Sequence, residues 1–260
     1  MLECVINISE GRDPGIIAAL SDGLGDHLLD VHSDPDHNRS VFTLIGEVAP
    51  RTLTSTAVQL LDMTQHDGVH PRLGVVDVVP FVPLEGSTID DALRARHDFA
   101  TWATTSLQVP IFFYGPERTL PHVRAHAWKD LQPDIGPLTP HHTAGAMCVG
   151  VRPPLVAYNL WLENVDLVET KNIAAAVRSA DIRTLGLQVG AYTQVSINLI
   201  NPMNAGPLDA YDAVAQHAPI HHAELVGLLP AAVLANIPRD RWEALDVSKE
   251  QTIEWRLTNR

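Results

Sequence analysis

The chain has 260 residues, of which 45% are hydrophobic and 19% charged, so it carries enough apolar material for a large core and is not expected to be disordered. Its formal net charge of −13 argues against nucleic acid as a partner, because nucleic-acid binders need clustered lysine and arginine side chains to displace counterions from phosphates. Its two cysteines, Cys4 and Cys148, are too few for a disulfide framework and lack metal-ligand spacing, which favours a reducing cytoplasm and predicts no metal site.

The first part of the chain alternates expected strands and helices. Short runs rich in β-branched residues predict strands, and apolar residues at helical spacing predict helices. In chain order we expect a strand at 2–8, a helix at 16–24 that Pro14 helps to start, strands at 28–32 and 41–45, a helix at 51–61, a strand at 75–82, a helix at 90–107 and a strand at 109–114. This alternation indicates an α/β sandwich.

The second part begins after a segment without clear periodicity. Residues 115–154 are rich in Pro, His and Gly, so we expect functional loops there. Beyond them we expect a strand at 155–162, a helix at 171–179, paired strands at 184–189 and 194–199, a helix at 208–216 and a strand at 220–226. This order, βαββαβ, is typical of a split βαβ unit, and the first part has a similar order of elements without a sequence repeat.

We therefore predict an α/β (α+β) fold with two ferredoxin-like split βαβ subdomains, residues 1–152 and 153–260. Their sheets are expected to be mostly antiparallel, with helices layered on one face. The N-terminus has neither a basic leader nor a long apolar stretch, and no segment approaches the roughly 20 apolar residues that cross a membrane. We expect a soluble, cytoplasmic protein without a membrane partner.

The densest group of chemically capable side chains is the segment from His66 to Gly74, with the sequence HDGVHPRLG, directly before the expected strand at 75–82. Loops at such junctions commonly hold reactive groups on rigid supports. Histidine both accepts and donates a proton near neutral pH, and Pro71 restricts the backbone around His70. His70 is therefore the candidate acid/base residue.

Two other interpretations of this segment stay open. In the first, His66 and His70 are ordinary surface residues among the thirteen histidines of the chain. In the second, they form a metal pair four residues apart. Gly68 and Pro71 would interrupt the helix that such a pair requires, and the glutamate of a zinc-protease motif is missing.

Two further loops concentrate groups that could bind a ligand. In residues 31–40, Asn38 and Arg39 offer an amide and a guanidinium that could orient a carboxylate, and the alternative is an acidic, solvated turn. In residues 136–146, backbone N–H groups between glycines and prolines could face a planar or anionic ligand. The alternative there is an irregular loop without a binding role.

Several separated segments carry a family resemblance that runs nearly end to end. They are ECVINISEG from Glu3, LDV from Leu29 followed by Asn38 and Arg39, HPRLGVVDVVPF from His70, DIGP from Asp134, QVSINL from Gln194 and ELVGLLP from Glu224. In this order they resemble the formiminotransferase domain of formiminotransferase-cyclodeaminase and the stand-alone bacterial glutamate formimidoyltransferases. Several motifs in one order are more specific than any single motif.

The resemblance implies an enzyme that transfers a formimino group between N-formimino-L-glutamate and tetrahydrofolate, its co-substrate, in histidine degradation and one-carbon metabolism. It implies that His70 takes the family's catalytic position, in a cleft between two subdomains of a homodimer, and that no cyclodeaminase half is present. The loop implied to line the folate pocket comprises Gly136, Pro137, Leu138, Thr139, Pro140, His141, His142, Thr143, Ala144 and Gly145. The expected substrate-binding residues are Asn7, Glu10, Asp30, His32, Asn38, Arg39 and Arg72.

The chemistry of the transfer agrees with these residue types. An amine attacks an amidine carbon and a second amine departs, so one imidazole suffices to move the proton, and no covalent nucleophile is required. Holding both substrates side by side should supply a comparable or larger share of the rate enhancement. Arg39 is the first candidate for binding a substrate carboxylate, and Arg72 the second.

The chain departs from the family pattern at three places. His32 stands where the family has an acidic residue, for which Asp34 is a possible substitute, and Ala144 stands where it has a tryptophan that could pack near the pterin. The turn between Arg178 and Leu187 is short and lacks a lysine-rich run, so weaker recognition of a polyglutamate tail is expected. Two alternatives follow: a folate-independent amidine hydrolase, and a folate-binding paralogue without transferase activity.

Overall fold

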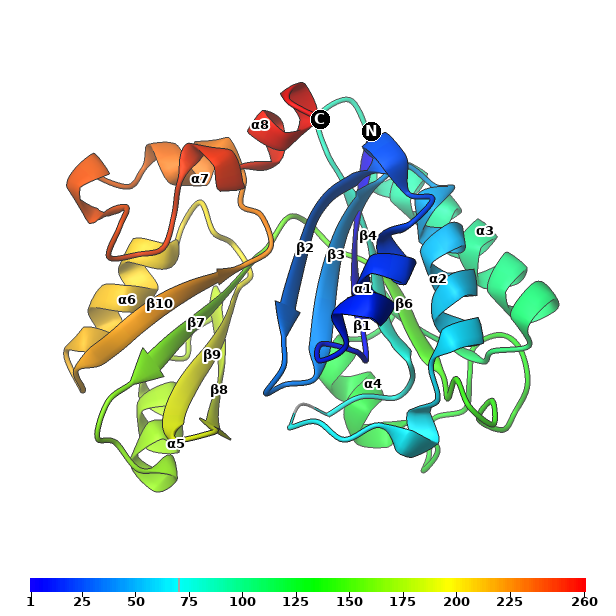
Figure 1. The fold of residues 1–260 in the computed structure, drawn as a ribbon, viewed down its shortest axis with the longest axis horizontal. Coiled ribbons are helices and arrows are strands. Elements are labelled where there is room, and N and C mark those ends of the chain that lie inside the picture. The colour runs from blue at the N-terminus through cyan, green and yellow to red at the C-terminus, as the bar shows by residue number, and fades with distance from the viewer. Residues whose placement is uncertain (70) are drawn as a thin grey trace. The chain divides into compact units, whose positions relative to one another are not determined.

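The computed structural model describes residues 1–69 and 71–260, so His70 lies outside the described residues. The chain forms two compact units, Met1–Pro153 and Pro154–Arg260, each with its own sheet (Figure 1). Within the described residues, no helix has the length and apolar character that crossing a membrane requires.

The first unit is built on a mixed six-stranded sheet with the order β2-β3-β1-β4-β6-β5. Its strands are β1 (Leu2–Ile8), β2 (Leu28–Asp34), β3 (Arg39–Ile45), β4 (Val76–Pro83), β5 (Ile111–Tyr114) and β6 (Met147–Val151). Strand β6 runs parallel to β4 and β5, and the other neighbours are antiparallel. The strands β2-β3-β1-β4 have the order of a split βαβ unit, which β6 and β5 extend.

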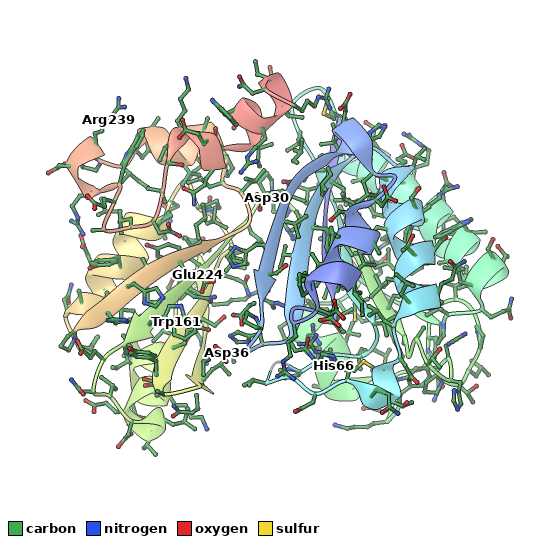
Figure 2. All side chains as sticks on the ribbon, in the orientation of Figure 1. Asp30, Asp36, His66, Trp161, Glu224 and Arg239 are labelled. Atoms are coloured by element: carbon green, nitrogen blue, oxygen red, sulfur yellow. The ribbon has the colours of Figure 1, made fainter. Side chains whose placement is uncertain are left out.

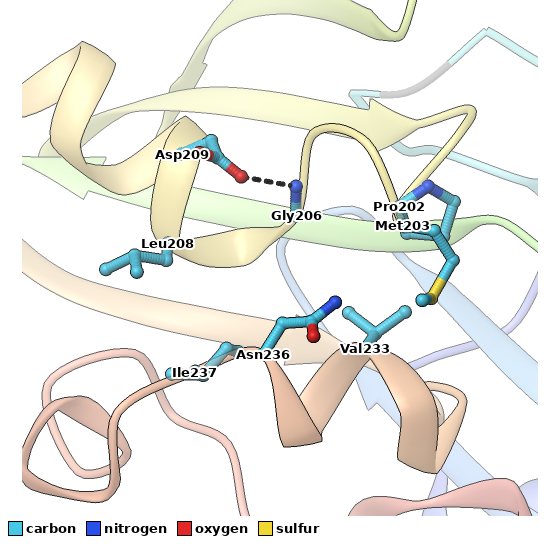
Figure 3. A pocket seen from close by; sticks show the side chains of 8 residues that line it. All are labelled: Pro202, Met203, Gly206, Leu208, Asp209, Val233, Asn236 and Ile237. Carbon is cyan, nitrogen blue, oxygen red and sulfur yellow. Dashed lines mark hydrogen bonds between the residues drawn. The ribbon is translucent and has the colours of Figure 1, made fainter.

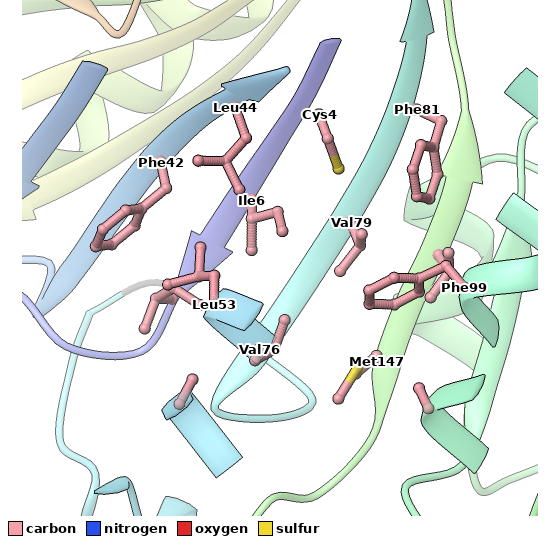
Figure 4. Packing of buried hydrophobic residues seen from close by; sticks show 14 of the residues in the cluster. Cys4, Ile6, Phe42, Leu44, Leu53, Val76, Val79, Phe81, Phe99 and Met147 are labelled. Carbon is pink, nitrogen blue, oxygen red and sulfur yellow. The ribbon is translucent and has the colours of Figure 1, made fainter. Parts of the chain in front are cut away.

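Three helices cover one face of this sheet: α1 (Pro14–Ser21), α2 (Ala49–Leu60) and α3 (Ile89–Leu107). Strands place alternate side chains on this face, in keeping with their period of two. Figure 4 shows the cluster beneath the helices, with the buried side chains Ile6, Phe42, Leu44, Leu53, Val76, Val79, Phe81, Phe99 and Met147. Because burying a large apolar side chain contributes about 1.5–3 kcal/mol, this cluster is the main force that holds the helices to the sheet.

A fourth helix, α4 (Leu120–His126), packs on the opposite face of the same sheet. There Val78 of β4, Phe112 of β5 and Cys148 of β6 form a second buried cluster with Val123 of α4. The expected layer of helices on one face thus consists of α1 to α3, and α4 adds a layer on the other. The reason is that β5 and β6 widen the sheet beyond the split βαβ core, and the segment that connects them covers the added surface.

The second unit contains an antiparallel four-stranded sheet with the order β10-β7-β9-β8. Its elements are β7 (Val156–Leu162), α5 (Leu167–Ala176), β8 (Ile182–Val189), β9 (Tyr192–Leu199), α6 (Pro207–Ala215), β10 (Ile220–Val226), α7 (Ala231–Ala235) and α8 (Ile253–Thr258). This is the strand order of a ferredoxin-like unit, so the predicted α/β fold class is confirmed. Short 3₁₀ turns occur in the two units at Gly25–His27, Met63–Gln65, Arg239–Arg241 and Lys249–Gln251.

Most expected elements are present, but several of their ends differ from the prediction. The helix expected at 16–24 ends at Ser21, because Gly23 has a φ of +76° in the left-handed region. The helix expected at 171–179 runs from Leu167 to Ala176, because the Asp166 carboxylate caps it early by accepting a hydrogen bond from the Glu169 N–H at 2.8 Å. The segment 115–154, expected to consist largely of loops, contains α4 and β6.

Candidate functional site

The candidate site lies at the end of the first sheet where β1 and β2 finish and β3, β4 and β6 begin. Figure 2 shows Asp36, from the β2–β3 turn, and His66, from the loop before β4, at this end of the unit. The sequence places the reactive residues in three separate loops, at 31–40, 66–74 and 136–146. At this end of the sheet the loop 66–74 contacts both of the others, 31–40 on one side and 136–146 on the other.

The loop before β4 pairs with the segment that leads into β6. The Val75 N–H donates to the Ala144 carbonyl at 3.1 Å, and the Ala146 N–H donates to the Leu73 carbonyl at 3.0 Å. Gly74 and Gly145 form the bridge between them, and a Cβ on Gly145 would lie 2.3 Å from the Leu73 carbonyl oxygen. Only glycine allows this close approach of two backbones.

Asn38 links three segments of the site through its side-chain amide. Its Oδ1 accepts a hydrogen bond from the Gly11 N–H at 3.0 Å, and its Nδ2 donates to the Asp67 carbonyl at 2.8 Å. Its backbone has a φ of +47°, a conformation in which asparagine is common. Because both polar atoms of the amide are engaged, Asn38 holds the end of β1 and the loop before β4 against the β2–β3 turn.

Arg72 forms a second link between the loop before β4 and the β2–β3 turn. Its Nη1 donates to the Asn38 carbonyl at 3.1 Å, and its Nη2 donates to the His37 carbonyl at 2.8 Å. Burial, opposed by Asp77 and assisted by Arg39 and Arg124, lowers the pKa of Arg72 to about 10. The side chain therefore stays charged at neutral pH, and it brings positive charge into the loop that carries the candidate acid/base residue.

His66 lies in the same loop, with its Nδ1 3.4 Å from Asn38 Nδ2. Burial, together with the charge of Arg72, lowers the pKa of His66 below its ordinary value of 6.5. The ring is therefore neutral at pH 7.

The remaining expected substrate-binding residues lie on the strands β1, β2 and β3 or just after β1. Asn7 of β1 and His32 of β2 both pair with Val41 of β3, so the three residues form one row across the sheet. Asp30 lies two residues before His32 in β2, opposite Thr43, and Figure 2 shows it away from Asp36 and His66.

Glu10 and Arg39 flank this row. Glu10 Oε1 accepts hydrogen bonds from the N–H groups of Arg12 and Asp13, which fixes the turn into α1. Arg39 is the first residue of β3, opposite Asp34.

The segment expected to line a folate pocket divides into an exposed and a buried part. Gly136, Leu138, Thr139, Pro140 and His142 are exposed, whereas Ala144 and Gly145 are buried against the loop before β4. Pro137, His141 and Thr143 are intermediate in exposure. Gly136 has a φ of +97°, and a Cβ there would lie 2.7 Å from Thr104 Cγ2. Its place in the chain therefore requires glycine.

His141 has a fixed ring orientation. Its Nδ1 accepts hydrogen bonds from the N–H groups of Thr143 at 3.3 Å and Ala144 at 3.0 Å, so the neutral ring carries its proton on Nε2. The Thr143 carbonyl in turn accepts from the Met63 N–H at 2.7 Å. The segment thus offers a donor of fixed orientation at His141 and, three residues earlier in the chain, an exposed apolar side chain, Leu138.

A cavity of about 230 Å³ lies elsewhere, in the second unit (Figure 3). It is lined by Pro202, Met203, Gly206, Leu208, Asp209, Val233, Asn236 and Ile237. None of these is an expected site residue, and no titratable pair capable of proton transfer lines it. Among residues 1–69 and 71–260, no group of three or more His, Cys, Asp or Glu side chains is arranged to hold a metal ion.

Two charged residues beside the site, Asp77 and Arg124, are not among the site residues expected from the sequence. Asp77 of β4 is 4% exposed and forms an ion pair with Arg124 of α4. The available signal is the single charge within the apolar run VVDVVPFV, since an ionised residue in a buried strand requires a partner.

Comparison with known proteins identifies the family of the chain. Residues 1–152 match the family of the formiminotransferase domain, N-terminal subdomain. A glutamate formimidoyltransferase of Streptococcus pyogenes is 32% identical, over 91% of this chain and 91% of that protein. One from Thermoplasma acidophilum is 29% identical, over 92% and 91%. A formimidoyltransferase-cyclodeaminase of Sus scrofa is 31% identical over 90% of this chain and 51% of that protein. The chain therefore belongs to the formiminotransferase family.

Proposed function

We propose that this chain is a glutamate formimidoyltransferase, which transfers a formimino group from N-formimino-L-glutamate to tetrahydrofolate in histidine degradation and one-carbon metabolism. The observation that carries the proposal is the similarity to the Streptococcus pyogenes enzyme, which extends over 91% of both chains. Tetrahydrofolate is the co-substrate, and the products are glutamate and a folate that carries the one-carbon unit.

We assign the general acid/base role to His70. In the transfer, a bond forms between N5 of tetrahydrofolate and the amidine carbon, and the bond between that carbon and the glutamate nitrogen breaks. The attacking amine must lose a proton and the departing amine must gain one, so a single imidazole returns to its starting state after each turnover. Such catalysis contributes roughly 10²–10⁴-fold to the rate.

The other predicted site residues take three kinds of role. Arg39 binds a carboxylate of formiminoglutamate, and Asn7, Glu10, Asp30 and His32 are the further substrate-binding residues. The Gly136–Gly145 segment binds the pterin of the folate. Asn38 and Arg72 act by holding the loop before β4, a role that the hydrogen bonds of their side chains support.

The quaternary and cellular setting follow from the same assignment. We propose that residues 1–152 and 153–260 are the two subdomains of the transferase, that the protein acts as a homodimer and that it resides in the cytoplasm. Two-fold dimers are the commonest state of soluble homo-oligomers. Light scattering of the purified chain should give a mass of two subunits, and a monomer mass would reject the dimer.

The decisive assay supplies formiminoglutamate with and without tetrahydrofolate and measures the release of glutamate. We expect turnover only when both are present. Turnover without folate, accompanied by ammonia or formamide, would instead identify a hydrolase. Tight folate binding by calorimetry without any turnover would identify a folate-binding protein that lacks transferase activity.

The role of His70 is tested by His70→Ala. We expect kcat to fall by roughly 10²–10⁴-fold while folate affinity stays within a few-fold. His97→Ala is the matched control, because His97 is an exposed histidine of α3 in the same unit. Unchanged turnover in His70→Ala would reject the assignment.

A further inference from the structure

Asp77 occupies an irregular position in β4. Along the pairing with β1, Ile8 is opposite Val76 and Asn7 is opposite Val78, so Asp77 is the extra residue of a β-bulge. In a regular strand Asp77 would share the face of Val79 and Phe81, which belongs to the apolar core beneath α1 to α3. The bulge instead directs the carboxylate toward α4, on the opposite face of the sheet.

Arg124 of α4 meets this carboxylate and also reaches the loop before β4. Its Nη2 lies 2.5 Å from Asp77 Oδ2, and its Nη1 donates to the carbonyl of Pro71 at 2.8 Å. Asp77 Oδ1 accepts from the Leu73 N–H at 2.8 Å. The two side chains thus hold two backbone groups of the loop, one of them in the residue that directly follows His70.

A second arginine in the same unit, Arg96, forms an ion pair that contacts no described residue of the loop before β4. Arg96 donates to both oxygens of Glu117, at 2.7 and 2.8 Å, and more weakly to the Tyr114 carbonyl at 3.5 Å. All of these acceptors lie at the end of β5 or just after it. Arg124 likewise contacts both oxygens of Asp77, through Nη2 at 2.5 Å and more weakly through Nη1 at 3.4 Å, but the carbonyl that its Nη1 reaches at 2.8 Å belongs to the loop before β4. This hydrogen bond to a second segment indicates that the Asp77–Arg124 pair supports the loop as well as the fold.

We propose that Asp77 and Arg124 are positioning residues, which fix the backbone after His70 so that its ring is presented to the reacting amines. This inference rests on the proposed function. The pair acts on the side of the loop that faces α4, while Asn38 and Arg72 act on the side that faces the β2–β3 turn. Support of the backbone next to His70 matters for the rate, because misplacement of a reacting group by about 1 Å can lower a rate by about 10²-fold.

The test compares Arg124→Gln and Arg124→Lys with the control Arg96→Gln. We expect Arg124→Gln to lower kcat by about 10- to 100-fold with KM within a few-fold, at a temperature where all variants are folded. Lysine keeps the positive charge but cannot donate to the Asp77 carboxylate and the Pro71 carbonyl from two nitrogens, so the kcat of Arg124→Lys should be intermediate. Added guanidinium should partly restore the kcat of Arg124→Gln. Arg96→Gln should lower the melting temperature and leave kcat unchanged. Equal kcat values for Arg124→Gln and Arg96→Gln would overturn the proposal.

A second measurement separates this proposal from the proposed function. NMR signals of the His70 ring, assigned with His70→Ala, should shift in Arg124→Gln and stay in place in Arg96→Gln. If the wild-type chain fails to transfer a formimino group but the ring signals respond as expected, the proposed function fails and the positioning role stands. If transfer occurs and neither kcat nor the ring signals change in folded Arg124→Gln, the positioning role fails alone.

Discussion

Gly74 lies where the loop before β4 meets the segment before β6, and it has no room for a side chain. A Cβ there would lie 2.3 Å from the Ala146 carbonyl oxygen and 2.5 Å from that of Ala144. Both contacts are to backbone atoms, so no side-chain rotation relieves them. We expect Gly74→Ala to lower the free energy of unfolding by about 1–3 kcal/mol, measured by urea denaturation, and to reduce kcat in the protein that remains folded.

Gly86→Ala is the control for this substitution. Gly86 has a φ of +81°, but a Cβ there would meet no atom within 4 Å, so alanine adds backbone strain without a clash. We expect a modest loss of stability, about 1 kcal/mol, and an unchanged kcat. Loss of activity to the same extent in both variants would contradict a specific role for the contact at Gly74.

The lowered pKa of His66 predicts a pH dependence of stability. Because the folded state resists protonation of this ring, the unfolded chain binds the proton first as the pH falls below about 6.5. Stability is therefore retained above that pH, decreases as the pH falls and stops decreasing once the folded state is protonated as well.

We expect NMR titration to give His66 a midpoint below 6.5 in the folded protein and near 6.5 in urea. His66→Gln should show a shallower loss of stability as the pH falls from neutral to mildly acidic values. An identical slope in wild type and variant would show that other groups cause the dependence.

For single residues, the sequence identifies the loops of the site but not the partners of each side chain. It marks Arg72 as the second candidate for binding a substrate carboxylate, and does not reveal that two of its N–H groups donate to carbonyls in the β2–β3 turn. Those carbonyls belong to residues distant in sequence, and every residue type offers one, so no sequence signal marks them. Asp77 stands out in the sequence as the single charge within an apolar run. The face of the sheet on which its side chain lies depends on a bulge, which only the pairing of β1 with β4 reveals.

Helix α3 begins with a reciprocal pair of hydrogen bonds between Thr88 and Asp91. Thr88 Oγ1 accepts from the Asp91 N–H at 3.2 Å, and the Asp91 carboxylate accepts from the Thr88 N–H at 2.9 Å. This capping box satisfies two N–H groups that the helix itself leaves free. Thr88→Ala should therefore lower the free energy of unfolding by about 1 kcal/mol.

Thr88→Ser is the matched control, because serine keeps the hydroxyl that accepts the hydrogen bond. We expect it to retain most of the stability in thermal unfolding followed by circular dichroism. Equal destabilisation by serine and alanine would assign the effect to the lost methyl group rather than to the cap.

The elements that the sequence does not reveal are short or lack a period. Helix α4 has 7 residues, too few for a spacing of apolar positions to become evident. Strand β6 has 5 residues, all of them buried, so it shows no alternation of polar and apolar positions. Both lie in a segment rich in Pro and Gly, which favours loops when residues are judged locally. The long helix α3, by contrast, begins and ends within one residue of its predicted bounds.

At the scale of the whole molecule, the two units share the strand order of a split βαβ unit, and the order of elements along the sequence is enough to predict it. The extension of the first sheet by β6 and β5 is not predictable in this way. Parallel strands require a long crossover, so the partner of β4 depends on residues far along the chain rather than on a neighbouring turn.

That parallel pairing has a consequence for how the protein acquires activity after synthesis or dilution from urea. Contacts between distant segments form slowly, because a long stretch of chain must close before they are made. The segment 144–146 supports the loop before β4 and joins directly to β6, so both become ordered late. We expect refolding chains to recover their far-ultraviolet circular dichroism before their transferase activity. Simultaneous recovery in a stopped-flow experiment would show that β6 docks early.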